Sequence, residues 1–171
     1  NACDPCRFHP KRDGGPAQMS SDSVKAKTTV LIITHASKNV TEQGIKDPLL
    51  YPGAPHTHLL EQVFDNLRER IGLIDAVIAF DHKIDCPVSA LYLENLRRFC
   101  DQRSARLVVS PTSLAMHNQL TATAAFLHGI RAIRSDYVLF FEHDHFFLRD
   151  VKWAIIDQAF AGGIRLVRFN E

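Results

Sequence analysis

Residues 28–34 (TTVLIIT) are the segment that most limits how this chain can fold, because they are apolar or β-branched at every position. A strand with one face in water alternates apolar and polar residues, whereas a strand covered on both faces does not. We therefore expect residues 28–34 to form a central strand between two layers of helices. Such a strand is typical of an α/β fold with a mostly parallel sheet.

Strand-like and helix-like patterns alternate along the rest of the chain. Further short apolar segments, each typical of a strand, occupy residues 75–80, 105–110, 137–142 and 164–169. Between them lie helical patterns, with apolar residues at three- and four-residue spacing, over residues 60–71, 87–100 and 115–134 and in a short stretch that Gly162 and Gly163 stop. This alternation predicts a Rossmann-like fold, with a mostly parallel sheet and helices on both faces.

Two details of the helices can be predicted as well. The third helix is expected to bury an apolar face made of Leu120, Ala124, Leu127 and Ile130. Asp150 is expected to cap the last helix, because an aspartate side chain can accept hydrogen bonds from the free amides of a first turn.

The domain is expected to begin near residue 27. Residues 1–26 carry several Pro, Gly and Ser residues and no apolar periodicity, so they predict a flexible tail or linker before a domain over residues 27–171. The sequence begins at Asn1 without a charged-then-apolar leader. We therefore expect it to be a fragment of a longer chain.

The composition fits one globular domain and limits the partners. Of the 171 residues, 46% are hydrophobic and 23% charged, and the formal net charge is +1. Without a long basic run, the chain lacks the charge pattern of a dedicated nucleic-acid-binding protein. Its longest apolar stretches are far shorter than the roughly 20 residues that cross a bilayer as a helix, so we expect no membrane span.

The cysteines indicate a reducing compartment. Cys86 and Cys100 flank one predicted helix, which would hold them about 20 Å apart, beyond the reach of a disulfide. Cys3 and Cys6 form a C-x-x-C pair, but no second ligand pair follows at the spacing of a zinc site. We therefore expect a cytoplasmic protein, and peripheral association with a membrane stays open.

Two carboxylates follow the apolar strand predicted over residues 137–142. Glu142 and Asp144 stand two positions apart, so the alternation of a strand sends both side chains to the same side. Mg²⁺ and Mn²⁺ prefer oxygen ligands and complete their coordination with water and with the oxygens of a bound diphosphate. We therefore expect a Mn²⁺ or Mg²⁺ site at Glu142 and Asp144, with His145 beside the metal. The alternative is a solvated acidic strand end without a ligand.

Polar residues also close the other predicted strands. Thr34 and His35 end the first strand, and Asp81 follows the second. In open parallel sheets, ligands bind outside the carboxyl ends of the strands. These residues are therefore candidates to contact the same ligand as the carboxylate pair.

The order of these features resembles the GT-A-fold glycosyltransferases, most closely those of family 2. In that family an acid-x-Asp motif binds the metal and the diphosphate of a sugar nucleotide. Glu142 and Asp144 match this motif, with Glu142 in place of the usual first Asp. The resemblance covers residues 28–171. It implies a hexosyltransferase-like enzyme with a nucleoside-diphosphate sugar as donor and an acceptor on a glycan, lipid or protein.

The resemblance also implies roles for other residues. The family's aspartate after the second strand contacts the nucleobase or ribose and is matched by Asp81. Its polar residue at the end of the first strand lies at the edge of the nucleotide and is matched by Thr34, with His35 next to it. Asn118 matches an asparagine in the helix that contacts the diphosphate, although the accompanying Gly and Arg of the family are missing here.

No general base can be assigned from the sequence. Inverting members of the family use a carboxylate, usually in the acceptor-binding half, to deprotonate the acceptor hydroxyl. After Asp150, the one convincing candidate is Glu171, the last residue. We therefore expect the base beyond Glu171, in a natural chain that continues past it.

Two other functions stay open. Residues 142–145 (EHDH), together with His56 and His58, offer the mixed nitrogen and oxygen ligands of a metal-dependent hydrolase. A non-catalytic sugar-binding module is the other alternative. A nucleotidyltransferase ranks lower, because residues 35–39 lack the glycines of a triphosphate-binding loop.

Overall fold

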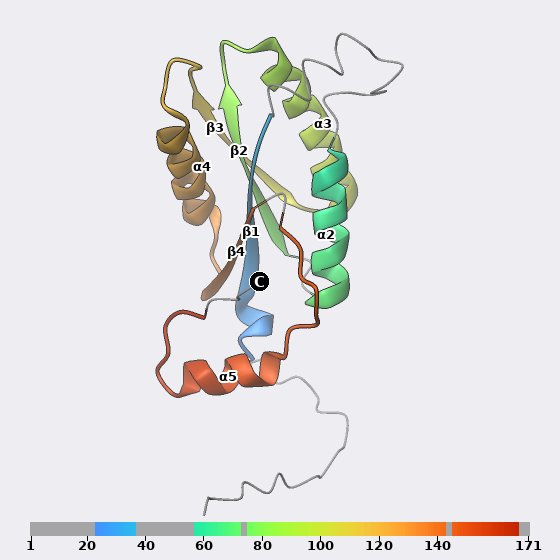
Figure 1. Ribbon diagram of the computed structural model, residues 1–171, viewed down its shortest axis with the longest axis vertical. Coiled ribbons are helices and arrows are strands. Elements are labelled where there is room, and N and C mark those ends of the chain that lie inside the picture. The colour runs from blue at the N-terminus through green and yellow to red at the C-terminus, as the bar shows by residue number, and fades with distance from the viewer. Residues whose placement is uncertain (1–22, 37–56, 73–74, 143–144, 168–171) are drawn as a thin grey trace, which may run out of the picture.

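The computed structural model describes residues 23–36, 57–72, 75–142 and 145–167. Within these ranges, four strands form one all-parallel sheet in the order β3-β2-β1-β4 (Figure 1). The strands are β1 (Thr28–His35), β2 (Ala76–Lys83), β3 (Arg106–Thr112) and β4 (Tyr137–Glu142), and a 3₁₀ turn, η1 (Lys25–Lys27), precedes β1. The helices are α2 (His58–Arg70), α3 (Pro87–Arg103), α4 (Asn118–Ala132) and α5 (Trp153–Ala161). This Rossmann-like arrangement confirms the predicted α/β fold.

β1 is the central strand that its sequence predicted. It pairs with β2 on one side and with β4 on the other. Val30, Leu31 and Ile32 are each at most 1% exposed. The lack of alternation between apolar and polar residues is therefore explained by a strand that has no face in water.

Helices cover the sheet on both faces (Figure 1). Val30 and Ile32 pack in one hydrophobic cluster with side chains of α2 and α3. Leu31, which lies between them in sequence, packs in a second cluster with Ala125 of α4. Because successive residues of a strand point to opposite faces, β1 contributes to both cores at once.

α4 contacts the sheet through small residues, so the predicted apolar face is wrong in its leucines. Thr121, Ala125 and Gly129 are buried, whereas Leu120 and Leu127 are 62% and 45% exposed. A Cβ atom added at Gly129 would lie 2.5 Å from a methyl carbon of β1 and 3.0 Å from one of β2. At this separation only small side chains fit between helix and sheet, and the leucines turn outward.

The chain after β4 differs from the prediction in two ways. α5 begins at Trp153 with Lys152 in the N-cap position, so Asp150 does not cap it. The carboxylate of Asp150 lies 3.3 Å from the guanidinium of Arg70 instead. Residues 164–167 form no strand, because they pair with no strand of the sheet, and the other two residues of that predicted strand, 168 and 169, lie outside the described ranges.

The amino-terminal end of the described chain is held against α5. Residues 1–22 of the predicted tail lie outside the described ranges, but Val24 is buried and its amide nitrogen donates to Asp157 Oδ1 at 2.8 Å. Cys86 and Cys100 are free thiols. Among the described residues, no helix is long and apolar enough to cross a membrane.

We predict that Gly129→Val lowers the free energy of unfolding by about 1 to 3 kcal/mol, the usual cost of overpacking a core. The added side chain would collide with the Leu31 methyl that lies 2.5 Å from the position of a Cβ atom alone. Urea unfolding followed by circular dichroism measures the change. His128→Val is the matched control, because His128 is the adjacent residue of α4 and is exposed. An equal loss in both variants would contradict the close approach of α4 to the sheet.

Candidate functional site

Polar side chains from neighbouring strands meet at the carboxyl edge of the sheet. His35 of β1 lies opposite Asp81 of β2, and Asp81 lies opposite Ser110 of β3. Ala79, two residues before Asp81, packs in the core cluster on the α4 side. By the alternation of a strand, Asp81 points to that same side. Two of the strand-end residues predicted from the sequence, His35 and Asp81, are therefore paired at this edge.

Glu142 stands where the strand order reverses. The chain runs from β1 to β2 and β3 on one side, and β4 then lies on the other side of β1. Glu142 ends β4 opposite Ile33. It faces α4, because Phe140 contacts Phe126 of α4 with ring centroids 5.3 Å apart and strand residues two apart share a face. In open α/β sheets ligands bind at such a switch point, so this topology favours a ligand at the carboxyl ends of β1 and β4.

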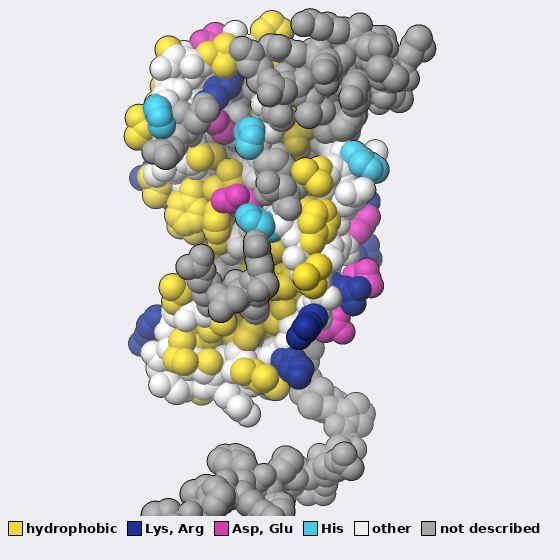
Figure 2. Space-filling view, in the orientation of Figure 1, with side chains coloured by type: hydrophobic (Ala, Val, Ile, Leu, Met, Phe, Trp, Pro, Cys, Tyr) yellow, Lys and Arg dark blue, Asp and Glu magenta, His cyan; other side chains and the backbone are white. Residues whose placement is uncertain are grey.

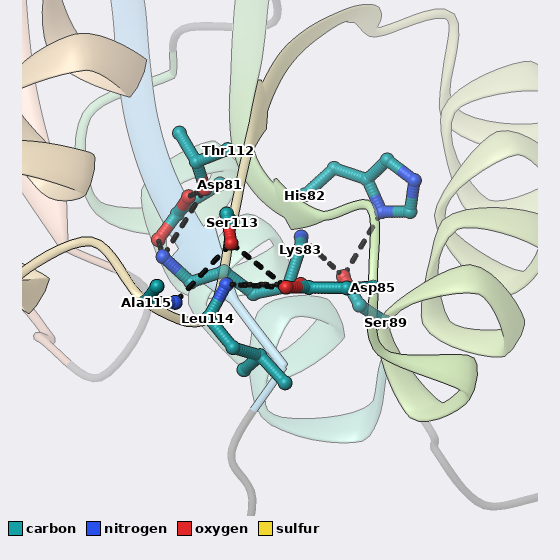
Figure 3. Close-up of polar contacts among 9 residues, drawn as sticks. All are labelled: Asp81, His82, Lys83, Asp85, Ser89, Thr112, Ser113, Leu114 and Ala115. Atoms are coloured by element: carbon teal, nitrogen blue, oxygen red, sulfur yellow. Dashed lines mark hydrogen bonds and ion pairs between the residues drawn. The ribbon is translucent and has the colours of Figure 1, made fainter.

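Asp81 lies in a compact polar cluster with Lys83 and Thr112 (Figure 3). Its side chain is buried and accepts a hydrogen bond from Thr112 Oγ1 at 2.6 Å. Lys83 Nζ lies 2.9 Å from Asp81 Oδ2 and also donates to Thr112 Oγ1 at 3.1 Å. The three groups come from the ends of β2 and β3, and each contacts the other two.

The surroundings of Asp81 keep its carboxyl group ionised. Burial by itself raises the pKa of Asp81, but hydrogen bonds from Thr112, Lys83 and Thr121, together with the charge of Lys83, outweigh it and hold the pKa below its ordinary value of 3.8. The carboxylate thus meets a ligand as a charge already balanced by an ammonium group. The sequence offered one signal for this pair, a lysine two residues after Asp81. It predicted both residues just after the second strand, whereas both belong to β2 in the structure.

Thr34 points to the other face of the sheet, the one covered by α3. Its hydroxyl is fully buried and lies 3.0 Å from the hydroxyl of Tyr92 in α3. Burial raises the pKa of Tyr92 to about 12, so its phenol stays neutral. The strand alternation that turns His35 toward α4 turns Thr34 toward α3, and the two predicted residues therefore do not point to one side.

Two further side chains brace the loops around Asp81 (Figure 3). Ser89 of α3 accepts a hydrogen bond from the amide nitrogen of Lys83 at 2.9 Å, and its hydroxyl lies 3.0 Å from His82 Nδ1. Asp85 accepts hydrogen bonds from the amide of Leu114 at 2.9 Å and from the Ser113 hydroxyl at 2.8 Å. The amide of Leu114 is the main reason that the pKa of Asp85 is lowered. These contacts tie the loop after β2 to α3 and to the loop after β3.

Glu142 and His145 come together just past β4. His145 Nδ1 lies 3.9 Å from Glu142 Oε2, and the amide of His145 donates to the Glu142 carbonyl at 3.3 Å. Both side chains are about half exposed, at 56% for Glu142 and 49% for His145. On the face of the molecule that Figure 2 shows, acidic and histidine side chains lie together near the middle, with hydrophobic side chains around them. A carboxylate and an imidazole within reach of solvent are a suitable start for a Mn²⁺ site.

Three residues of interest are described only in part or not at all. His143 and Asp144 lie outside the described ranges. Asn118 is the first residue of α4, and its side chain is not among those described. Within the described residues, no group of three or more His, Cys, Asp and Glu side chains forms a metal-ligand cluster. The described part of the candidate metal site is thus the pair of Glu142 and His145.

No protein-family model matches this chain, and comparisons with curated proteins and with solved structures return no significant match.

We predict that Lys83→Met lowers the free energy of unfolding at pH 7 by about 3 kcal/mol, the order expected when one partner of a buried ion pair is removed. Asp81 would remain buried as a carboxylate without its ammonium partner. Arg70→Met is the control, because its ion pair with Asp150 is partly exposed and such pairs contribute about 0 to 1 kcal/mol. Chemical denaturation of both variants measures the difference.

The same variant should change how stability depends on pH. The lowered pKa of Asp81 in the folded parent stabilises the fold above about pH 4, and this stabilisation is lost as the pH falls through the folded-state pKa. In Lys83→Met burial continues to raise the pKa of Asp81 while the ammonium is gone. Acid destabilisation should therefore begin at a higher pH than in the parent. Identical pH profiles would contradict the ion pair.

Proposed function

We propose that this chain is the nucleotide-binding part of a metal-dependent glycosyltransferase, of GT-A type, that transfers a sugar from a nucleoside-diphosphate donor to an acceptor hydroxyl. The observation that carries the proposal is the position of Glu142 at the switch point between β1 and β4, on the same face as Asp81. A diphosphate with its metal needs an exposed carboxylate at such an edge, and Glu142 is exposed there.

The two carboxylates suit different tasks. Asp81 is buried and paired with Lys83, so it fits a hydrogen-bonded contact with the base or ribose of the nucleotide better than a place beside a cation. Glu142 is exposed and has His145 as neighbour, so it fits the coordination of Mn²⁺ or Mg²⁺. In the sequence, Asp144 supplies a further carboxylate between Glu142 and His145.

The chemistry that this arrangement supports is departure of a nucleoside diphosphate. In the reaction the bond between the sugar's anomeric carbon and the diphosphate oxygen breaks, and a bond from that carbon to the acceptor oxygen forms. A divalent cation at Glu142 would neutralise the negative charge that builds on the diphosphate. The acceptor hydroxyl loses its proton to a general base, which we assign to no described residue.

We predict that Mn²⁺ with UDP or GDP raises the melting temperature of the chain by about 5 to 10 °C at a nucleotide concentration 100 times Kd. Glu142→Gln and Asp144→Asn should each lose at least half of this shift, because the amide that replaces each carboxylate binds the cation poorly. Asp150→Asn, a change of an exposed carboxylate further along the same segment, should keep all of it. Differential scanning fluorimetry measures the shifts.

The proposal fails if no nucleoside diphosphate moves the melting temperature in the presence of Mn²⁺ and Glu142→Gln behaves as the parent does. Zinc or iron retained through purification would favour the metal-dependent hydrolase. Binding of a nucleotide sugar without its hydrolysis or transfer by the complete gene product would favour a non-catalytic sugar-binding module.

A further inference from the structure

The segment that follows the candidate metal site is fastened along α2. From residue 145 on, it runs beside that helix towards α5 (Figure 1). The amide of Val151 donates to the carbonyl of Arg70 at 3.2 Å, and Trp153 Nε1 donates to the carbonyl of Ile71 at 3.0 Å. Both contacts lie at the far end of the segment. Close to the metal site, a different contact with α2 is made by Asn66.

Asn66 binds both backbone groups of Phe147. Its Oδ1 accepts a hydrogen bond from the Phe147 amide at 2.8 Å, and its Nδ2 donates to the Phe147 carbonyl at 3.1 Å. The planar amide has a donor and an acceptor side by side, so it can engage one residue's backbone as a neighbouring strand would. The two bonds fix the position and the direction of the chain at Phe147.

Holding Phe147 in place also restricts the position of His145, two residues before it. Its ring stacks on Phe141, with centroids 5.2 Å apart and planes at 27°. The ring of His145 meets the same Phe141 edge to face, with ring centroids 6.2 Å apart. Phe141 directly precedes Glu142 in the sequence. Phe147 is half-buried, whereas the other described residues of the run 145–150 are exposed. Phe147 is therefore the anchor of an otherwise exposed segment, and Asn66 holds that anchor.

We propose that Asn66 is a positioning residue for the metal site: by holding Phe147 it keeps His145 beside Glu142, so that the ligands are ordered before the cation arrives. This inference rests on the proposed function, since it assumes a cation at Glu142. Ordering an exposed segment costs conformational entropy. A segment that is already held in place binds its ligand more tightly, because less of that cost is paid on binding.

The test is the affinity of the 171-residue chain for Mn²⁺ alone, read from the electron paramagnetic resonance signal of the free ion. Asn66→Ala should weaken Mn²⁺ binding about tenfold or more, the effect usual for residues that orient metal ligands. It should also speed hydrogen exchange at the amides around Phe147. Asn66→Gln, which keeps the amide on a longer stem, should recover part of the affinity and gives a second reading if Asn66→Ala folds poorly.

Arg70→Gln is the matched control. Arg70 lies on the same helix and its side chain pairs with Asp150 of the same segment at 3.3 Å, whereas the side chain of Asn66 binds the backbone of Phe147. Its Mn²⁺ affinity should stay within about twofold of the parent, as expected of an exposed ion pair.

Each outcome decides. Weakened binding in Asn66→Ala at an unchanged melting temperature, with Arg70→Gln like the parent, supports the inference. Parental Mn²⁺ affinity in Asn66→Ala overturns it, even if the melting temperature falls, while the metal site itself stands. An affinity in Asn66→Gln no higher than that in Asn66→Ala overturns it as well. Equal losses in Asn66→Ala and Arg70→Gln overturn it too. Absence of Mn²⁺ binding in the parent removes the proposed function and this inference together.

Discussion

The double-sided burial of β1 is the constraint on which the rest of this structure depends. Val30 and Ile32 hold α2 and α3 to one face, and Leu31 holds α4 to the other. Burying each such side chain contributes about 1.5 to 3 kcal/mol. A polar residue at any of these positions would weaken one of the two cores. With β1 fixed between β2 and β4, the carboxyl ends of the strands, and so the polar residues that follow them, are brought to one edge.

At that edge the protein keeps two kinds of carboxylate. Asp81 is enclosed by Lys83 and Thr112 and carries a balanced charge, whereas Glu142 is open to solvent beside His145. The difference follows from position, because Asp81 lies near the end of β2, a strand with neighbours on both sides, and Glu142 ends β4, the outer strand of the described sheet. A buried ion pair is specific in geometry, and an exposed carboxylate is available to a cation.

The parts of the fold that could be predicted are those in which burial requires a recognisable pattern of apolar residues. The strands and α2 followed from apolar patterns, since those residues face a core. The contact face of α4 did not, because the helix touches the sheet through Gly129, Ala125 and Thr121, and small residues give no hydrophobic signal. The prediction of a fifth strand was wrong because it rested on local pattern alone. Residues 164–169 (IRLVRF) have the pattern of a strand, but residues 164–167 have no strand beside them.

The location of the candidate site could be predicted from the sequence, but the contacts of its residues could not. Strand ends pointed to Asp81 and Glu142, yet a sequence does not state which face each strand-end residue takes. Alternation separates Thr34, which contacts Tyr92, from His35. Asn66 carried no signal at all, because it lies 81 positions from Phe147 and within an ordinary amphipathic helix.

The most direct test of a metal-diphosphate unit at Glu142 is paramagnetic broadening of the histidine ring protons in the nuclear magnetic resonance spectrum. Mn²⁺ added with UDP or GDP should broaden the signal of His145, which lies 3.9 Å from Glu142, before those of His58 and His128, and Glu142→Gln should abolish this selectivity. An unaffected His145 signal, or broadening of all three histidines at the same Mn²⁺ concentration, would contradict a cation site at the end of β4.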